Sequence, residues 1–162
     1  MSRPPSPRGT CQICQRVQRA HNGFMGAIAK HGYNVVGRGH SGFFNGTCPG
    51  SSWPALELNC DQAKQRAKWA REGAAALLAQ ADTEDVVSAD GTGWKHCRIK
   101  SAWGAAHYEW LKYDYVQDLS VCADRVEIAV RIATKGNKEY AEHLRREAAR
   151  HTAFAEFLES AV

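Results

Sequence analysis

Four residues in the first third of the sequence have the side chains and the spacing of a metal site. Cys11 and Cys14 form a C-x2-C pair, sixteen residues separate Cys14 from His31, and sixteen more separate His31 from Cys48. Thiolate and imidazole ligands suit Zn²⁺, and structural zinc sites usually close with four of them. A two-residue gap lets one tight turn present both sulfurs, and each longer gap leaves room for a strand and its return. The sequence therefore predicts one structural Zn²⁺ held by these four side chains.

Three other residues compete for the fourth ligand position. His40 lies between a glycine and a serine, His21 lies within reach in the same glycine-rich segment, and Cys60 immediately precedes a predicted helix. We expect His40 in an exposed loop and Cys60 in the core, since an unligated cysteine usually packs as a small hydrophobic residue. A redox role for the C-x2-C pair would need a βαβ context, which this sequence lacks.

The segments CQICQRVQ, HGYNVVGRGHSGFFNGTCPG and LELNCD resemble uncharacterised zinc-ribbon proteins of bacteriophages and mobile elements. Those proteins share a C-x2-C pair, a histidine followed by glycine and an aromatic residue, a glycine-rich stretch, a G-x-C-x-G segment and then a polar helical hairpin. The resemblance covers residues 11–61 and implies the same four metal ligands, but it implies no activity. Val35 and Val36 stand where such proteins usually have a proline.

The metal ligands need a scaffold, and the composition divides the chain into three parts. Residues 1–9 are basic and rich in proline, which predicts a disordered arm. Residues 10–58 combine glycines with short apolar runs, which is typical of short strands and tight turns and predicts a ribbon-like zinc module. So small a module buries little apolar surface and depends on its metal. Residues 59–162 are predicted to form a helical domain.

Apolar residues recur at helical spacing in three segments of that domain. The first segment carries a stripe of alanines, which permits close approach of a partner helix. Gly136 and Asn137 interrupt the pattern and predict a helix end, and residues 86–104 predict a turn followed by a short extended segment. The expected fold is α+β, a zinc-ribbon-like module followed by an antiparallel helical hairpin or a three-helix bundle. The predicted helices span residues 61–81, 105–134 and 138–160.

Basic residues are concentrated in the metal module. Residues 1–60 carry six Lys or Arg residues and one acidic residue, whereas residues 61–162 carry fifteen Lys or Arg residues and sixteen acidic residues. The two parts together give the net charge of +4. This asymmetry favours an anionic partner. The helix after the module adds three basic residues on one face, and residues 94–103 interleave aromatic with basic side chains, as base stacking and phosphate contact require. The candidate binding residues are Arg16, Arg19, Lys30, Arg38, Lys64, Lys68, Arg71, Trp94, Lys95, Arg98 and Lys100.

The sequence predicts a binding protein and no enzyme. Four ligands leave no open coordination position for a catalytic zinc, and the sequence contains no metalloprotease, deaminase, P-loop or dinucleotide-binding motif. The basic module favours nucleic acid as the partner. The alternative partner is a host protein or an anti-phage defence protein, because Tyr108, Trp110 and Tyr113 lie off the apolar stripe of the predicted helix and suit a protein interface. A homo-oligomer would satisfy the same observation.

The sequence predicts no contact with a membrane. It has no run of about 18 apolar residues, and its basic start is not followed by the apolar stretch of a signal peptide. We therefore expect a cytoplasmic protein of a bacterial host cell, with reduced thiols available for metal binding.

Overall fold

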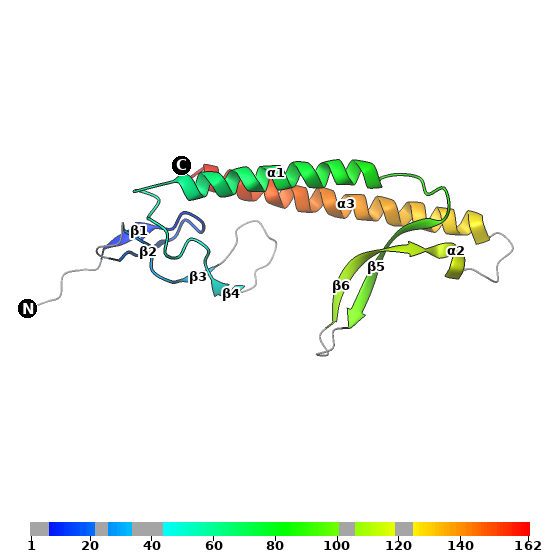
Figure 1. Cartoon of the computed structure of the whole chain (residues 1–162), viewed down its shortest axis with the longest axis horizontal. Coiled ribbons are helices and arrows are strands. Elements are labelled where there is room, and N and C mark those ends of the chain that lie inside the picture. The colour runs from blue at the N-terminus through cyan, green and yellow to red at the C-terminus, as the bar shows by residue number, and fades with distance from the viewer. Residues whose placement is uncertain (1–6, 22–25, 34–43, 101–105, 119–124) are drawn as a thin grey trace, which may run out of the picture. The chain divides into compact units, whose positions relative to one another are not determined.

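A computed structural model of the chain contains nine helices and strands in its described residues (Figure 1). Helices and strands both occur, and the strands form three two-stranded antiparallel pairs, so the predicted α+β class is confirmed. The structure describes residues 7–21, 26–33, 44–100, 106–118 and 125–162. The elements are β1 (Arg8–Thr10), β2 (Val17–Arg19), β3 (Gly32–Tyr33), β4 (Phe44–Thr47), α1 (Asp61–Glu84), β5 (Thr92–Lys100), β6 (Ala106–Asp114), α2 (Tyr115–Asp118) and α3 (Arg125–Glu159).

The chain divides into two compact units, and each contains part of both long helices. The first unit comprises Met1–Ala74 and Ala149–Val162, and the second comprises Ala75–Ala148. The pairs β1–β2 and β3–β4 belong to the first unit, and the β5–β6 hairpin belongs to the second. Among the described residues, no helix is long and apolar enough to cross a membrane.

The alanine stripe of α1 lies in the core, as its spacing predicts. Five alanines of this helix are buried, and the observed helix extends the predicted one by three residues. In the first unit the stripe joins a buried cluster with residues of α3 and with the cysteines of the N-terminal module. Small side chains let the elements approach closely, so the module packs directly against helical backbone. The cluster comprises Cys11, Ile13, Cys14, Ile28, Cys48, Ala55, Ala67, Ala70, Ala155 and Leu158.

The prediction of a helix over residues 105–134 is wrong for its first part. Residues 106–114 form β6, which pairs with β5 over nine residue pairs from Thr92 opposite Asp114 to Lys100 opposite Ala106. Aromatic residues at alternate positions favour a strand, and pairing with β5 outweighs the helical spacing of the apolar residues that begins at Leu111. A short helix, α2, and the start of α3 at Arg125 account for the described remainder.

The predicted helix end at Gly136 and Asn137 is also wrong, because α3 runs without a break through both residues. A Cβ at position 136 would collide with the backbone carbonyl of Trp94 in β5. The Asn137 side chain is buried; its Oδ1 accepts a hydrogen bond from the Trp94 amide at 3.3 Å, and its Nδ2 donates to the Val86 carbonyl at 3.0 Å. These two residues therefore dock the hairpin onto the helix.

Two residues of the predicted disordered arm, Arg8 and Gly9, belong to β1, where they pair with Arg19 and Gln18. A Cβ at Gly9 would lie 2.5 Å from the Cβ of Ala55, so glycine permits the strand to lie against the chain that leads into α1. The rest of the predicted arm, apart from Pro7, lies outside the described residues.

Candidate metal centre

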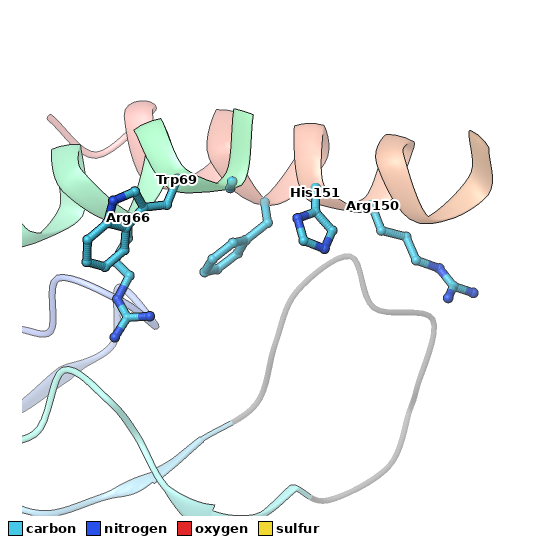
Figure 2. A pocket seen from close by; sticks show the side chains of 6 residues that line it. Arg66, Trp69, Arg150 and His151 are labelled. Carbon is cyan, nitrogen blue, oxygen red and sulfur yellow. The ribbon is translucent and has the colours of Figure 1, made fainter. Parts of the chain in front are cut away.

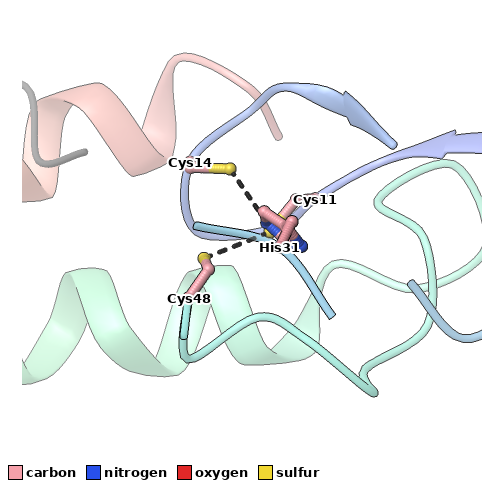
Figure 3. A group of neighbouring side chains, drawn as sticks. All are labelled: Cys11, Cys14, His31 and Cys48. Atoms are coloured by element: carbon pink, nitrogen blue, oxygen red, sulfur yellow. Dashed lines mark hydrogen bonds between the residues drawn. The ribbon is translucent and has the colours of Figure 1, made fainter. Parts of the chain in front are cut away.

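The turn between β1 and β2 carries the first two donors. The Gln15 amide donates to the Cys11 carbonyl at 2.9 Å, and the Cys11 amide donates to the Arg16 carbonyl at 3.0 Å. Gln15 has a φ of 56°, in the left-handed region that closes such a tight turn. This turn places Cys11 and Cys14 close to each other and to His31 and Cys48 (Figure 3).

The second pair of donors flanks β3 and β4. His31 immediately precedes β3 and Cys48 immediately follows β4, and the Cys48 amide donates to the His31 carbonyl at 2.9 Å. Gly32 and Thr47 are directly opposite in the strand pair. Antiparallel pairing therefore brings together two residues that are separated by sixteen in the sequence, which is the strand and return that the spacing predicts.

The four donor atoms lie close enough together to surround one metal ion. All lie within 4.8 Å of one another, with 3.7 Å between the sulfurs of Cys11 and Cys48 and 3.3 Å between Cys14 Sγ and His31 Nε2. Typical Zn–S and Zn–N bond lengths place two sulfurs about 3.8 Å apart and a sulfur and a nitrogen about 3.5 Å apart. A disulfide needs a sulfur separation of about 2.05 Å, so the cysteines are free thiols positioned around one point. The four residues can hold a metal ion.

The His31 ring is oriented by a backbone carbonyl. Its Nδ1 lies 2.8 Å from the carbonyl oxygen of Ala29 and 3.3 Å from the Ser51 hydroxyl. A proton on Nδ1 would donate to that carbonyl, which leaves the Nε2 lone pair directed at the sulfurs. Metal-binding histidines commonly have such a partner on the second nitrogen, because it selects the tautomer and the ring orientation.

Burial raises and backbone hydrogen bonds lower the pKa values of the three thiols. Cys11 and Cys48 are almost completely inaccessible to solvent, and burial raises the pKa of Cys48. The Cys11 thiol donates to Cys14, which raises the pKa of Cys11 and lowers that of Cys14 to about 4. Backbone amides of residues 13, 14, 16 and 50 also stabilise the thiolates. One bound cation would replace these protons and compensate the negative charge of all three sulfurs.

Gly50 is required by the close approach of the second donor loop to the first. A Cβ at this position would lie 2.5 Å from Cys11 Sγ and 3.2 Å from the Cγ1 of Ile13. The position is buried, and the Gly50 amide donates a hydrogen bond that lowers the pKa of Cys48. Any side chain here would displace a metal donor.

Gln12 is a functional residue of the metal loop that sequence reasoning missed. Its side chain is fully buried; Oε1 accepts a hydrogen bond from the amide of Ala63 at 3.1 Å, and Nε2 donates to the carbonyl of Pro54 at 2.9 Å. The Ala63 amide is one of the first N–H groups of α1, which lack partners inside the helix. A residue between the two cysteines thus caps the helix that follows the module. A glutamine at this position gives no local signal of such a role.

The other candidates for the fourth ligand position do not enter this cluster where the structure describes them. His21 is exposed. Cys60 is half-buried immediately before α1, and its carbonyl accepts a hydrogen bond from the Lys64 amide. Neither belongs to the group of four donors. His40 lies outside the described residues.

The predicted binding residues of the first unit differ in how their charges are compensated. Arg16, Arg19 and Lys30 are exposed on the module. Lys64 is exposed on α1, whereas Lys68 lies 3.9 Å from a carboxylate oxygen of Glu72. Arg71 forms a bidentate ion pair with Glu159 of α3, and this ion pair raises the pKa of Arg71. The predicted basic face of α1 is therefore partly neutralised. Arg38 lies outside the described residues.

The predicted binding residues of β5 belong to the second unit and already have contacts there. The Trp94 ring stacks on Tyr140 with 4.0 Å between ring centroids, and its Nε1 donates to Glu84 at 2.7 Å. The ammonium of Lys95 lies 3.8 Å from the centre of the Tyr113 ring. Arg98 is exposed opposite Tyr108. The side chain of Lys100, the last residue of β5, is not described.

Comparison with known proteins adds no relative from which a function could be transferred. No protein-family model matches the chain, and no curated protein or solved structure is significantly similar to it. The likeness to zinc-ribbon proteins of bacteriophages and mobile elements stays a prediction from the sequence.

Proposed function

We propose that this protein is a non-enzymatic binding protein, stabilised by one structural Zn²⁺, which contacts nucleic acid through a basic face of its first unit. The observation that carries the proposal is a pair of exposed arginines, Arg8 and Arg19, directly opposite each other on β1 and β2, next to a complete set of four metal donors. In this proposal the metal ion stabilises the fold of the module, and the basic face binds the nucleic acid.

Zinc is the metal that the donor set favours. Three sulfurs and one imidazole nitrogen form a soft, tetrahedral set, which selects Zn²⁺ over oxygen-seeking cations such as Mg²⁺ and Ca²⁺. Four protein ligands complete a tetrahedron, so no coordination position remains for water or substrate. The burial of all three cysteines supports the same structural role.

The charge distribution of the module favours an anionic partner. Like charges directly opposite on neighbouring strands repel each other, and among the described residues no ion pair neutralises Arg8, Arg19 or Lys30. The one acid of residues 1–60, Glu57, accepts hydrogen bonds from the backbone amide and the hydroxyl of Thr10, which lower its pKa. The repulsion is relieved when phosphates bind between the basic side chains.

The test is the salt dependence of binding to short single- and double-stranded DNA and RNA, measured by fluorescence anisotropy with the zinc-loaded chain. We expect binding that weakens steeply with salt. Neutralising Arg8 and Arg19 together with glutamine should weaken binding about tenfold or more and reduce the salt slope by about two. The matched control neutralises Lys135 and Lys138 of the second unit, which removes the same charge. Failure to bind any of these nucleic acids at low salt would refute the proposal.

A protein partner is the second candidate, and one feature of the second unit favours it. Tyr108 and Leu111, on opposite faces of β6, are 61% and 40% exposed, and exposed aromatic side chains are enriched at protein interfaces. A host protein or an anti-phage defence protein would bury them, and so would a second copy of the chain. If nucleic acid does not bind, a bacterial protein captured by the parent chain would favour this candidate. The double variant Tyr108→Ser, Leu111→Ser should then no longer capture that protein.

A further inference from the structure

A pocket in the first unit lies between the facing sides of α1 and α3 and is separate from the metal donors. Its volume is about 170 Å³. Figure 2 shows the labelled side chains projecting from the two helices toward one side. No carboxylate is among the lining residues, although both helices are rich in acids. The pocket is lined by Arg66, Trp69, Ala70, Arg150, His151 and Phe154.

Arg66 has no anionic partner in the described part of the chain. Its guanidinium carbon lies 5.4 Å from the ring centre of Trp69 and 5.7 Å from that of Trp53, so two indole rings flank the cation. Its Nε is buried and has no hydrogen-bond acceptor among the described residues. A buried donor without an acceptor is uncommon in folded proteins. A guanidinium that is held in place but left uncompensated is prepared to bind an anion.

The facing helix contributes a second cation and an imidazole. Arg150 and His151 are consecutive residues of α3, and both line the pocket. A Cβ at Gly73 of α1 would lie only 3.0 Å from His151 Nδ1, so a glycine in the middle of this helix leaves space for the imidazole ring. Glycine is a poor helix former, and its presence here is explained by this close approach.

Aromatic rings make up the remaining wall. The Trp69 side chain is 53% exposed even though it is large and apolar, and Phe154 packs on the core cluster below the pocket. An inorganic anion would pair with an arginine of the pocket but would leave these aromatic rings exposed to solvent. An engineered protein cavity of about 150 Å³ holds a benzene ring, and the pocket is larger than that cavity. The pocket therefore suits a planar ring that carries an anionic group.

We propose that this pocket binds one nucleotide, with its base against Trp69 and Phe154 and its phosphate at the guanidinium of Arg66. Base stacking on aromatic side chains and phosphate pairing with guanidinium groups supply the affinity. A free nucleoside monophosphate and the phosphorylated end of a strand carry the same chemistry. The inference goes beyond the proposed function, because it does not need the basic face of β1 and β2.

The experiment titrates the zinc-loaded full chain with AMP, adenosine and inorganic phosphate, followed by calorimetry and by the indole NMR signal of Trp69. AMP should bind at least about tenfold more tightly than either fragment, since only AMP engages both walls. The variant Arg66→Gln should weaken AMP binding about tenfold, because it removes the charge that pairs with the phosphate. Arg71→Gln is the matched control on α1, because Arg71 is paired with Glu159 and does not line the pocket. Trp69→Ala is the second variant: Trp69 is exposed, so its removal weakens AMP binding through lost base stacking without disturbing the core.

The source of the nucleotide is resolved by competition. Displacement of AMP by a 5′-phosphorylated oligonucleotide, but not by the same oligonucleotide without its phosphate, identifies a strand end as the ligand. AMP binding without such displacement identifies a free nucleotide. Absence of AMP binding at millimolar concentration, or equal affinity for AMP and phosphate, overturns the proposal. Neutralising Arg8 and Arg19 should leave AMP affinity unchanged, so failure here and failure of strand binding by the basic face are distinguishable.

Discussion

The strand pairs of the first unit and the β5–β6 hairpin of the second differ in length, in composition and in what packs against them. Strands β1 to β4 are two to four residues long, and their buried cluster includes the three cysteine donors themselves. Strands β5 and β6 are nine residues each, and Trp94 and Trp110 of the hairpin pack on Tyr140 of α3. The two regions are small β structures with different sources of stability.

This difference shows that a short chain can stabilise small pairs of strands in two ways. In the first unit four donors converge on one point, so a metal can replace the apolar core that so few residues cannot build. In the second unit ring stacking and the buried amide of Asn137 attach the hairpin to a long helix. Metal removal and mutation at the hairpin contact should therefore affect the two regions separately.

The largest expected effect is that of metal removal on the first unit. Changing Cys48→Ser, or adding a strong chelator, removes an apparent binding free energy of roughly 10–16 kcal/mol. Protection of amides against hydrogen exchange in β1 to β4 should then be lost, while the β5–β6 amides keep most of theirs. Acidification should act in the same direction, because protons compete with the metal for the thiolates.

Metal analysis provides the control for this prediction. We expect about one equivalent of Zn²⁺ per chain, and Cys97→Ser should retain it, because Cys97 lies in β5 and outside the donor cluster. Equal loss of protection in both regions on metal removal would contradict the separation of the two sources of stability.

An intermediate effect is expected at the hairpin contact. Gly136→Ala places a methyl group against the backbone carbonyl of Trp94, and overpacking of this kind costs about 1–3 kcal/mol. Chemical denaturation of the zinc-loaded chain, with Trp94 exposure as a second readout, measures the change. The control is Gly32→Ala, because an added Cβ at this position meets no atom within 4 Å. A neutral Gly136→Ala would show that the hairpin can move away from α3 without cost.

The smallest expected effect concerns the connection between the metal loop and α1. Gln12→Ala removes the acceptor of the Ala63 amide and leaves the Pro54 carbonyl without its donor, which should cost about 1–2 kcal/mol. Gln62→Ala is the control, because this glutamine is exposed on the same helix turn. Thermal unfolding of both variants with saturating zinc decides the matter. If both variants unfold like the parent chain, the cap contributes nothing and the metal alone positions the loop.

Several features of this protein follow from local sequence patterns. Ligand types and spacing identify Cys11, Cys14, His31 and Cys48 as donors, and the structure brings all four together. The alanine stripe of α1 identifies its buried face. Both patterns are readable because thiol chemistry is a property of the side chain and helical periodicity is a property of a few consecutive turns.

Other features were decided only by tertiary structure. Leu111 begins a run of apolar residues at helical spacing, yet residues 106–114 form a strand because a second strand is available for nine pairs. Gly136 and Asn137 resemble a helix end, yet the helix continues because the glycine admits a strand backbone and the amide pairs with it. Gln12 reads as a polar loop residue, yet it caps a helix that begins about fifty positions later.

The sequence by itself therefore determined the metal donors, the buried face of the first helix and the basic character of the module. Tertiary structure decided which backbone groups found partners across the chain: the strand pairing of β5 with β6, the continuity of α3 and the cap supplied by Gln12. The physical reason is that buried backbone N–H and C=O groups must be satisfied. Residues far apart in the sequence can satisfy them, and no local pattern of side chains records which residues will do so.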